Sequence, residues 1–71
     1  MVQPLLAEQV AMVERHILQG EINVSAQRHR VHALEASGKE AGFSRALLAT
    51  FQQSLAMHYG HRAALLREIA E

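Results

Sequence analysis

The chain of 71 residues contains no cysteine, a single proline and few aromatic side chains, namely Phe43, Phe51 and Tyr59. Because cysteine is absent, no disulfide can stabilise the fold, and this absence is compatible with a reducing compartment without identifying one. A domain this short usually needs a disulfide, a metal or a partner subunit to complete its core. We therefore expect one domain, residues 1–71, that associates with a second copy of itself.

Neither charge is in excess, and no long apolar run is present. Seven basic residues balance seven acidic ones, so nothing draws the chain as a whole toward nucleic acid, an anionic membrane or an acidic substrate. A membrane-spanning helix needs roughly 18 apolar residues without charge, and no stretch approaches that. The segment 1–9 lacks the basic start of a signal peptide, and Glu8 interrupts it. We expect a soluble cytoplasmic protein without a membrane partner.

Motifs of catalysis are missing as well. None of the serines has the GxSxG context of a hydrolase nucleophile, and no glycine-rich loop is present that would hold a phosphate. We therefore expect neither an enzyme nor a bound cofactor.

What the chain does contain is two series of residues spaced by seven. The first series is Val10, Ile17, Val24 and Val31, and the second is Leu48, Leu55, Arg62 and Ile69. Apolar residues that recur every seven positions keep one face of a helix directed at a partner helix, as in a coiled coil. The pattern therefore predicts an all-α protein with two long helices that pack against each other.

The segment between the two series indicates a turn. Gly38 is placed to take the left-handed conformation that ends a helix, and Pro4 suits the first turn of a helix. The second helix could begin at Glu40 or, with the better capping side chain, at Ser44. We predict a helix at about 5–36, a turn at about 37–42 and a helix at about 43–70, folded into an antiparallel two-helix hairpin.

The apolar face of the second helix is wider than one partner helix can cover. It occupies about a third of the circumference, and its members are Leu47, Leu48, Phe51, Leu55, His58, Tyr59, Arg62, Leu65, Leu66 and Ile69. A lone hairpin would leave half of this face in water. We therefore expect two hairpins to pair into a homodimeric four-helix bundle.

Five residues on the packing faces are polar or lack a side chain: Gly20, Glu21, Gln27, His58 and Arg62. Folding about residue 41 would place Arg62 over Gly20, with Glu21 as its countercharge. The alternative is that Arg62 extends along the edge of the seam into water. We expect His58 to form a hydrogen bond with Gln27 or Glu21, which would fix the register of the helices.

Two pairs of histidines stand one helical turn apart, His29 with His32 and His58 with His61. Catalytic zinc takes three protein ligands and structural zinc four, and no HExxH motif is present. We therefore expect separate, exposed or hydrogen-bonded histidines and no metal site.

Two surfaces are candidates for binding a partner. The first is an outer apolar or small-residue surface, which suits another protein and consists of Leu18, Ile22, Ala49, Ala56 and Gly60. The second is a mildly basic surface near the turn, which consists of Arg28, Arg30, Lys39 and Arg45. Small dimeric helical hairpins of the Rop type bind RNA through such a surface, and the chain resembles them in architecture alone. Zero net charge and scarce aromatics favour a protein interaction module over an RNA-binding regulator.

A looser resemblance runs through most of the chain. It rests on the segments Glu14-Arg15-His16-Ile17, Gly20-Glu21, Gln27-Arg28, Leu34-Glu35, Gly38, Leu47-Leu48-Ala49-Thr50-Phe51, Leu55, His58 and His61-Arg62. In these segments the chain resembles a group of short bacterial helical-hairpin proteins of unknown function. The resemblance implies the hairpin fold and no activity, substrate or site.

Overall fold

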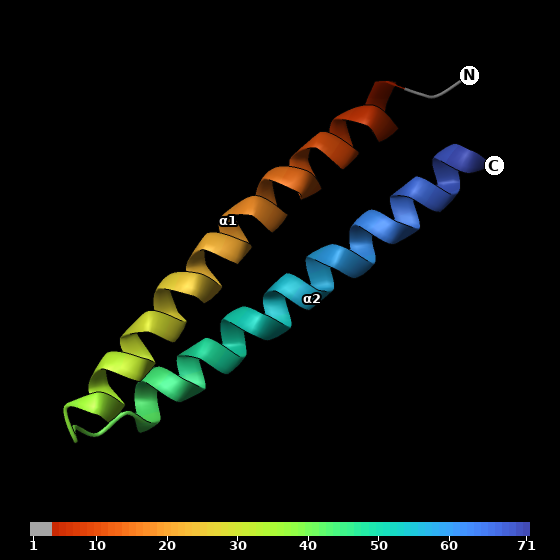
Figure 1. Cartoon of the computed structure of the whole chain (residues 1–71). Helices are drawn as coiled ribbons and strands as arrows, with labels where there is room; N and C mark the ends of the chain where they lie inside the picture. Colours follow the sequence, from red (N-terminus) through yellow and green to blue (C-terminus); the bar gives the residue numbers. More distant parts are fainter. Residues whose placement is uncertain (1–3) are drawn as a thin grey trace.

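The computed structural model describes residues 4–71 as two helices joined by a short turn (Figure 1). Helix α1 spans Pro4–Ala36 and helix α2 spans Gly42–Ala70. The helices run antiparallel, with the start of α1 and the end of α2 at one end of the molecule and the turn at the other. The predicted all-α hairpin is therefore confirmed for this part of the chain. Residues 1–3 of the expected domain lie outside the described residues.

The turn begins with a hydrogen-bonded helix end. Gly38 has a φ of 68°, which side chains disfavour and glycine accepts. Its N–H donates to the carbonyl oxygen of Glu35 at 3.1 Å, and the N–H of Lys39 donates to that of Leu34 at 2.9 Å. These two bonds form a Schellman motif, which satisfies carbonyl groups that the end of a helix leaves free. The motif explains why α1 stops at Ala36.

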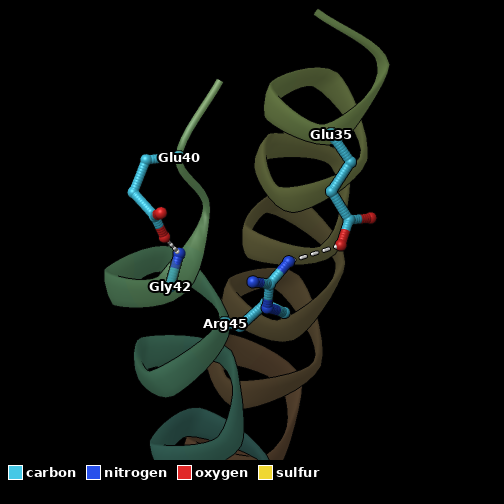
Figure 2. Close-up of polar contacts among 4 residues, drawn as sticks. All are labelled: Glu35, Glu40, Gly42 and Arg45. Carbon is cyan, nitrogen blue, oxygen red and sulfur yellow. Dashed lines mark hydrogen bonds and ion pairs between the residues drawn. The ribbon is translucent and has the colours of Figure 1, made fainter. Parts of the chain in front are cut away.

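Helix α2 begins between the two positions considered for it. Its first residue is Gly42, whose N–H donates to the Glu40 carboxylate at 2.5 Å (Figure 2). A carboxylate is favourable at this end of a helix because the free N–H groups there carry partial positive charge. Ser44, the later of the two positions, lies inside the first turn.

The core is a thin line along the contact between the helices. Its apolar members are Val13, Ile17, Val24, Val31, Ala41 and Leu65. Four of them belong to α1, whereas Leu65 is the buried residue of α2. The other apolar members of the α2 face are half-buried or exposed, because α1 covers only part of that face.

The hairpin is elongated. Its radius of gyration over Cα atoms is 16.3 Å, and its principal extents are 57 × 14 × 13 Å. A compact domain of this length would have a radius of gyration of about 11 Å. Each helix therefore has one neighbour, and most of its circumference faces solvent.

Candidate interaction surfaces

Two edges flank the contact between the helices. His16 lies against His58, whereas Glu21 contacts Tyr59. Successive residues of an α-helix are about 100° apart, so the five steps from His16 to Glu21 rotate the side chain by about 140°. The step from His58 to Tyr59 adds about 100° on α2. The two contacts therefore lie on opposite sides of the seam.

We call the side of Glu21 and Tyr59 the charged edge. Glu35 follows Glu21 by two heptads, and Arg45 precedes Tyr59 by two heptads, so a second contact lies on this edge. There the Arg45 guanidinium meets the Glu35 carboxylate at 2.7 Å between Nη1 and Oε2 (Figure 2). Both polar contacts join α1 to α2 along the charged edge.

The hydrogen bond of Tyr59 changes the titration of its phenol. The Tyr59 hydroxyl donates to Glu21 Oε2 at 2.5 Å, and the Arg62 guanidinium lies 5.6 Å from the centre of the Tyr59 ring. The bond to Glu21 raises the pKa of Tyr59 above its usual value, burial and the charge of Glu21 raise it further, and Arg62 lowers it. Ionised Tyr59 would lose its hydrogen and face a carboxylate.

We expect the Glu21→Ala variant to titrate its tyrosine at a lower pH than the parent chain. The folded-state pKa of Tyr59 is raised above the unfolded value, which is about 10. The contact therefore stabilises the fold below that value, and the contribution is lost as the pH rises through the folded-state pKa. Tyrosinate absorbance measures this directly, because the chain has one tyrosine and no tryptophan. Glu14→Ala, one heptad earlier on α1, is the control. An unchanged midpoint in Glu21→Ala would refute the contact.

Gln27 is the buried polar residue of the seam. Gln27 is 7% exposed, and its side-chain amide nitrogen donates to the backbone oxygen of Ser44 at 3.0 Å. Both partners expected for His58 therefore bond elsewhere. Gln27 donates to a backbone carbonyl of α2, and Glu21 accepts from Tyr59. Within residues 4–71, no buried polar side-chain atom lacks a hydrogen-bond partner.

Gly20 does not accommodate Arg62, which corrects the expected arrangement. A Cβ on Gly20 would lie 3.0 Å from Leu55 Cδ1, so Leu55 occupies the space that the glycine leaves. Arg62 lies half-buried over Tyr59 instead. The turn is centred between Ala36 and Gly42, earlier than the assumed residue 41. That difference moves every cross-helix partner by about one helical turn.

The opposite side of the seam, which we call the histidine edge, is open. The His16 and His58 rings have centroids 5.2 Å apart and are tilted by 46°. A hollow of about 160 Å³ is lined by His16, Gln19, Gly20, Asn23, Phe51, Ser54 and His58. A second hollow of about 220 Å³ is lined by Gln9, Met12, Val13, His16, His58 and His61. Both hollows include the histidine pair, and neither is lined by a lysine, arginine, aspartate or glutamate.

His61 was expected beside His58, and the structure adds His16 from the other helix. Among the described residues, however, no group of three histidines or carboxylates is placed to hold a metal ion. His16 was not among the site residues predicted from the sequence. The available signal was the presence of a histidine on the flank of the α1 packing face.

The two candidate partner surfaces remain predictions. On the outer surface, Leu18 and Ile22 are 61% and 53% exposed, and Ala49, Ala56 and Gly60 are exposed too. The basic residues are exposed but not gathered. Arg28 and Arg30 point about 160° apart around α1, and Arg45 already pairs with Glu35.

No helix among residues 4–71 has the length and apolar character that crossing a membrane requires. No family model matches the chain, and no curated protein or solved structure is found to be similar to it, so the resemblance to short bacterial hairpins stays a prediction.

Proposed function

We propose that this chain is a non-catalytic protein interaction module whose working form is a homodimer. Two hairpins would close into a four-helix bundle with coiled-coil packing and present their outer surfaces to another protein. The observation that carries the proposal is the thin core, which leaves large apolar side chains in water. Phe43 is 82% exposed and Met57 is 74% exposed.

The surface area supports pairing. The chain exposes 5282 Å², whereas a compact monomer of its mass exposes about 4400 Å². The excess is about 900 Å², close to the roughly 800 Å² that each partner buries in a protein interface of standard size. One additional copy is therefore enough to cover the excess.

The outer apolar surface supports the second part of the proposal. Leu18 and Ile22 stand on α1 one turn apart, and Gly60 has open space where a Cβ would lie. Adjacent apolar side chains on one helix form the kind of stripe that a partner helix recognises. After dimerisation this surface would remain available for binding.

We expect the purified chain to sediment as a dimer at micromolar concentration, with a melting temperature that rises with protein concentration. Dimerisation stabilises the folded state by mass action, so dilution lowers the melting temperature. Sedimentation velocity and melting over a hundredfold range of concentration measure both. A chain that sediments as a monomer, with a melting temperature independent of concentration, would overturn the proposal.

A further inference from the structure

We infer that the second copy docks on the histidine edge, where it fills the two hollows beside His16 and His58. The inference rests on the proposed homodimer and names its interface. The question is which edge of the hairpin the second copy covers. The alternative to the histidine edge is the charged edge.

The charged edge is the costlier side to bury. The side chains of Arg45 and Glu35 are 54% and 47% exposed there, so their charges keep much of their hydration. A second copy would remove that water, and the desolvation of an ion pair can exceed the attraction between its members. Tyr59 and Glu21 already form a hydrogen bond with each other on the same edge. Docking there would add few new polar contacts.

The histidine edge offers unfilled volume without charge. Protein interiors are close-packed, and hollows of about 160 and 220 Å³ each have room for a large side chain. Met12 lines the larger hollow and is 50% exposed. Met57, three residues after Ser54 and four before His61, lies on the same face of α2. Apolar side chains of both helices therefore line the hollows, Met12 from α1 and Phe51 from α2, and Met57 lies on the same face.

The position of the histidine pair suits a two-fold axis. His16 and His58 each lie within about one turn of the middle of their helix. The hollows lie on either side of the pair, since Met12 lines one and Asn23 the other. In a two-fold dimer the same patch is used by both copies. An axis through the histidine pair would place Met12 of one copy against the hollow beside Phe51 of the second copy.

Two charge substitutions of similar exposure distinguish the edges. Met12→Glu places a carboxylate on the histidine edge. Leu66→Glu places one on the charged edge, because Leu66 follows Tyr59 by one heptad. Met12 is 50% exposed and Leu66 is 47% exposed, so the two changes perturb the single hairpin similarly. Circular dichroism verifies that both variants remain helical.

We expect Met12→Glu to weaken dimerisation by about 100-fold or more, since symmetry buries the new charge twice. Leu66→Glu should leave the dissociation constant within a few-fold of the parent value. Sedimentation equilibrium measures both constants. If Leu66→Glu dissociates the dimer, the inference is wrong, whether or not Met12→Glu dissociates it too. The inference is also wrong if neither variant dissociates the dimer. A parent chain that is monomeric would instead overturn the homodimer itself.

Cysteine labelling gives a second test that does not depend on the Met12→Glu variant folding. The chain has no cysteine, so Ser54→Cys and Gln52→Cys each introduce a single thiol at an exposed position. Ser54 lines the smaller hollow, whereas Gln52 precedes Tyr59 by one heptad and so lies on the charged edge. Maleimide should react more slowly with Ser54→Cys at dimer-forming concentration than after dilution, while Gln52→Cys reacts equally at both. Protection of Gln52→Cys but not of Ser54→Cys would overturn the inference.

Discussion

Replacing Gln27 by glutamate is expected to destabilise the hairpin by about 3 kcal/mol at neutral pH. Gln27 is buried, and its amide nitrogen donates to the Ser44 carbonyl oxygen at 3.0 Å. A carboxylate has no hydrogen to donate, so the substitution would place a negative oxygen against the carbonyl oxygen in a buried site. An uncompensated buried charge is among the few changes that remove several kcal/mol at once.

The loss in Gln27→Glu should depend on pH. Burial and the facing carbonyl raise the pKa of the introduced carboxyl in the folded state above its unfolded value of about 4.3. The protonated acid can donate to Ser44, so the penalty is absent below the unfolded pKa and grows as the pH rises through the folded-state pKa. Urea unfolding at pH 7 and pH 4, each compared with the parent chain at the same pH, measures it. Gln53→Glu is the control because Gln53 is exposed. Equal stability of Gln27→Glu and the parent at pH 7 would show that the hydrogen bond from the Gln27 amide to Ser44 does not stabilise the fold.

The second large effect concerns neighbouring residues of α1. Ile17→Ala should cost about 2–5 kcal/mol, whereas Leu18→Ala should change the free energy of unfolding by less than about 0.5 kcal/mol. Ile17 is 5% exposed and Leu18 is 61% exposed, although both are large and apolar. A domain of this length has a total stability of about 4–10 kcal/mol, so the Ile17 substitution removes a large share of it.

Denaturant unfolding of both variants under one set of conditions measures this contrast. It holds whichever of the two edges carries the dimer, because Leu18 belongs to the outer surface. A loss in Leu18→Ala that rivals the loss in Ile17→Ala would place Leu18 inside an interface and contradict the assignment of that surface to a separate partner.

The fold could be predicted because its signal is carried by repeated residues. The seven-residue spacing of Val10, Ile17, Val24 and Val31 indicates a packed helix wherever the chain turns, and Gly38 marks the end of that helix. Register was harder to predict. It depends on the hydrogen bonds of the Schellman motif, which set the end of α1 to the residue, and on competition for the space at Gly20. Leu55 took that space because burial favours it, while Arg62 keeps its charge in contact with water beside Tyr59.

The polar contacts along the two edges of the hairpin were largely not predicted, because they too depend on register. Gln27 does lie on the packing face, as the sequence predicts. Its hydrogen-bond partner is a backbone oxygen, which a pattern of side chains cannot predict. The contact between Tyr59 and Glu21 did have a signal. Tyr59 and Glu21 lie two heptads from Arg45 and Glu35, so a polar pair repeats along one edge. The spacing of apolar residues alone does not reveal this repeat.

The antiparallel hairpin shown in Figure 1 also determines the order in which we expect its contacts to form during folding. The contact of Glu35 with Arg45 next to the turn closes a short loop. Bringing Gln9 and His61 to the same hollow closes a loop that spans most of the chain. The entropy lost on closing a loop grows with its length, so the contacts nearest the turn form at the lowest cost. Each helical turn that docks then shortens the loop left for the next one. We therefore expect the hairpin to close from Gly38 outward, and the end of the molecule opposite the turn to be the last to assemble and the first to separate.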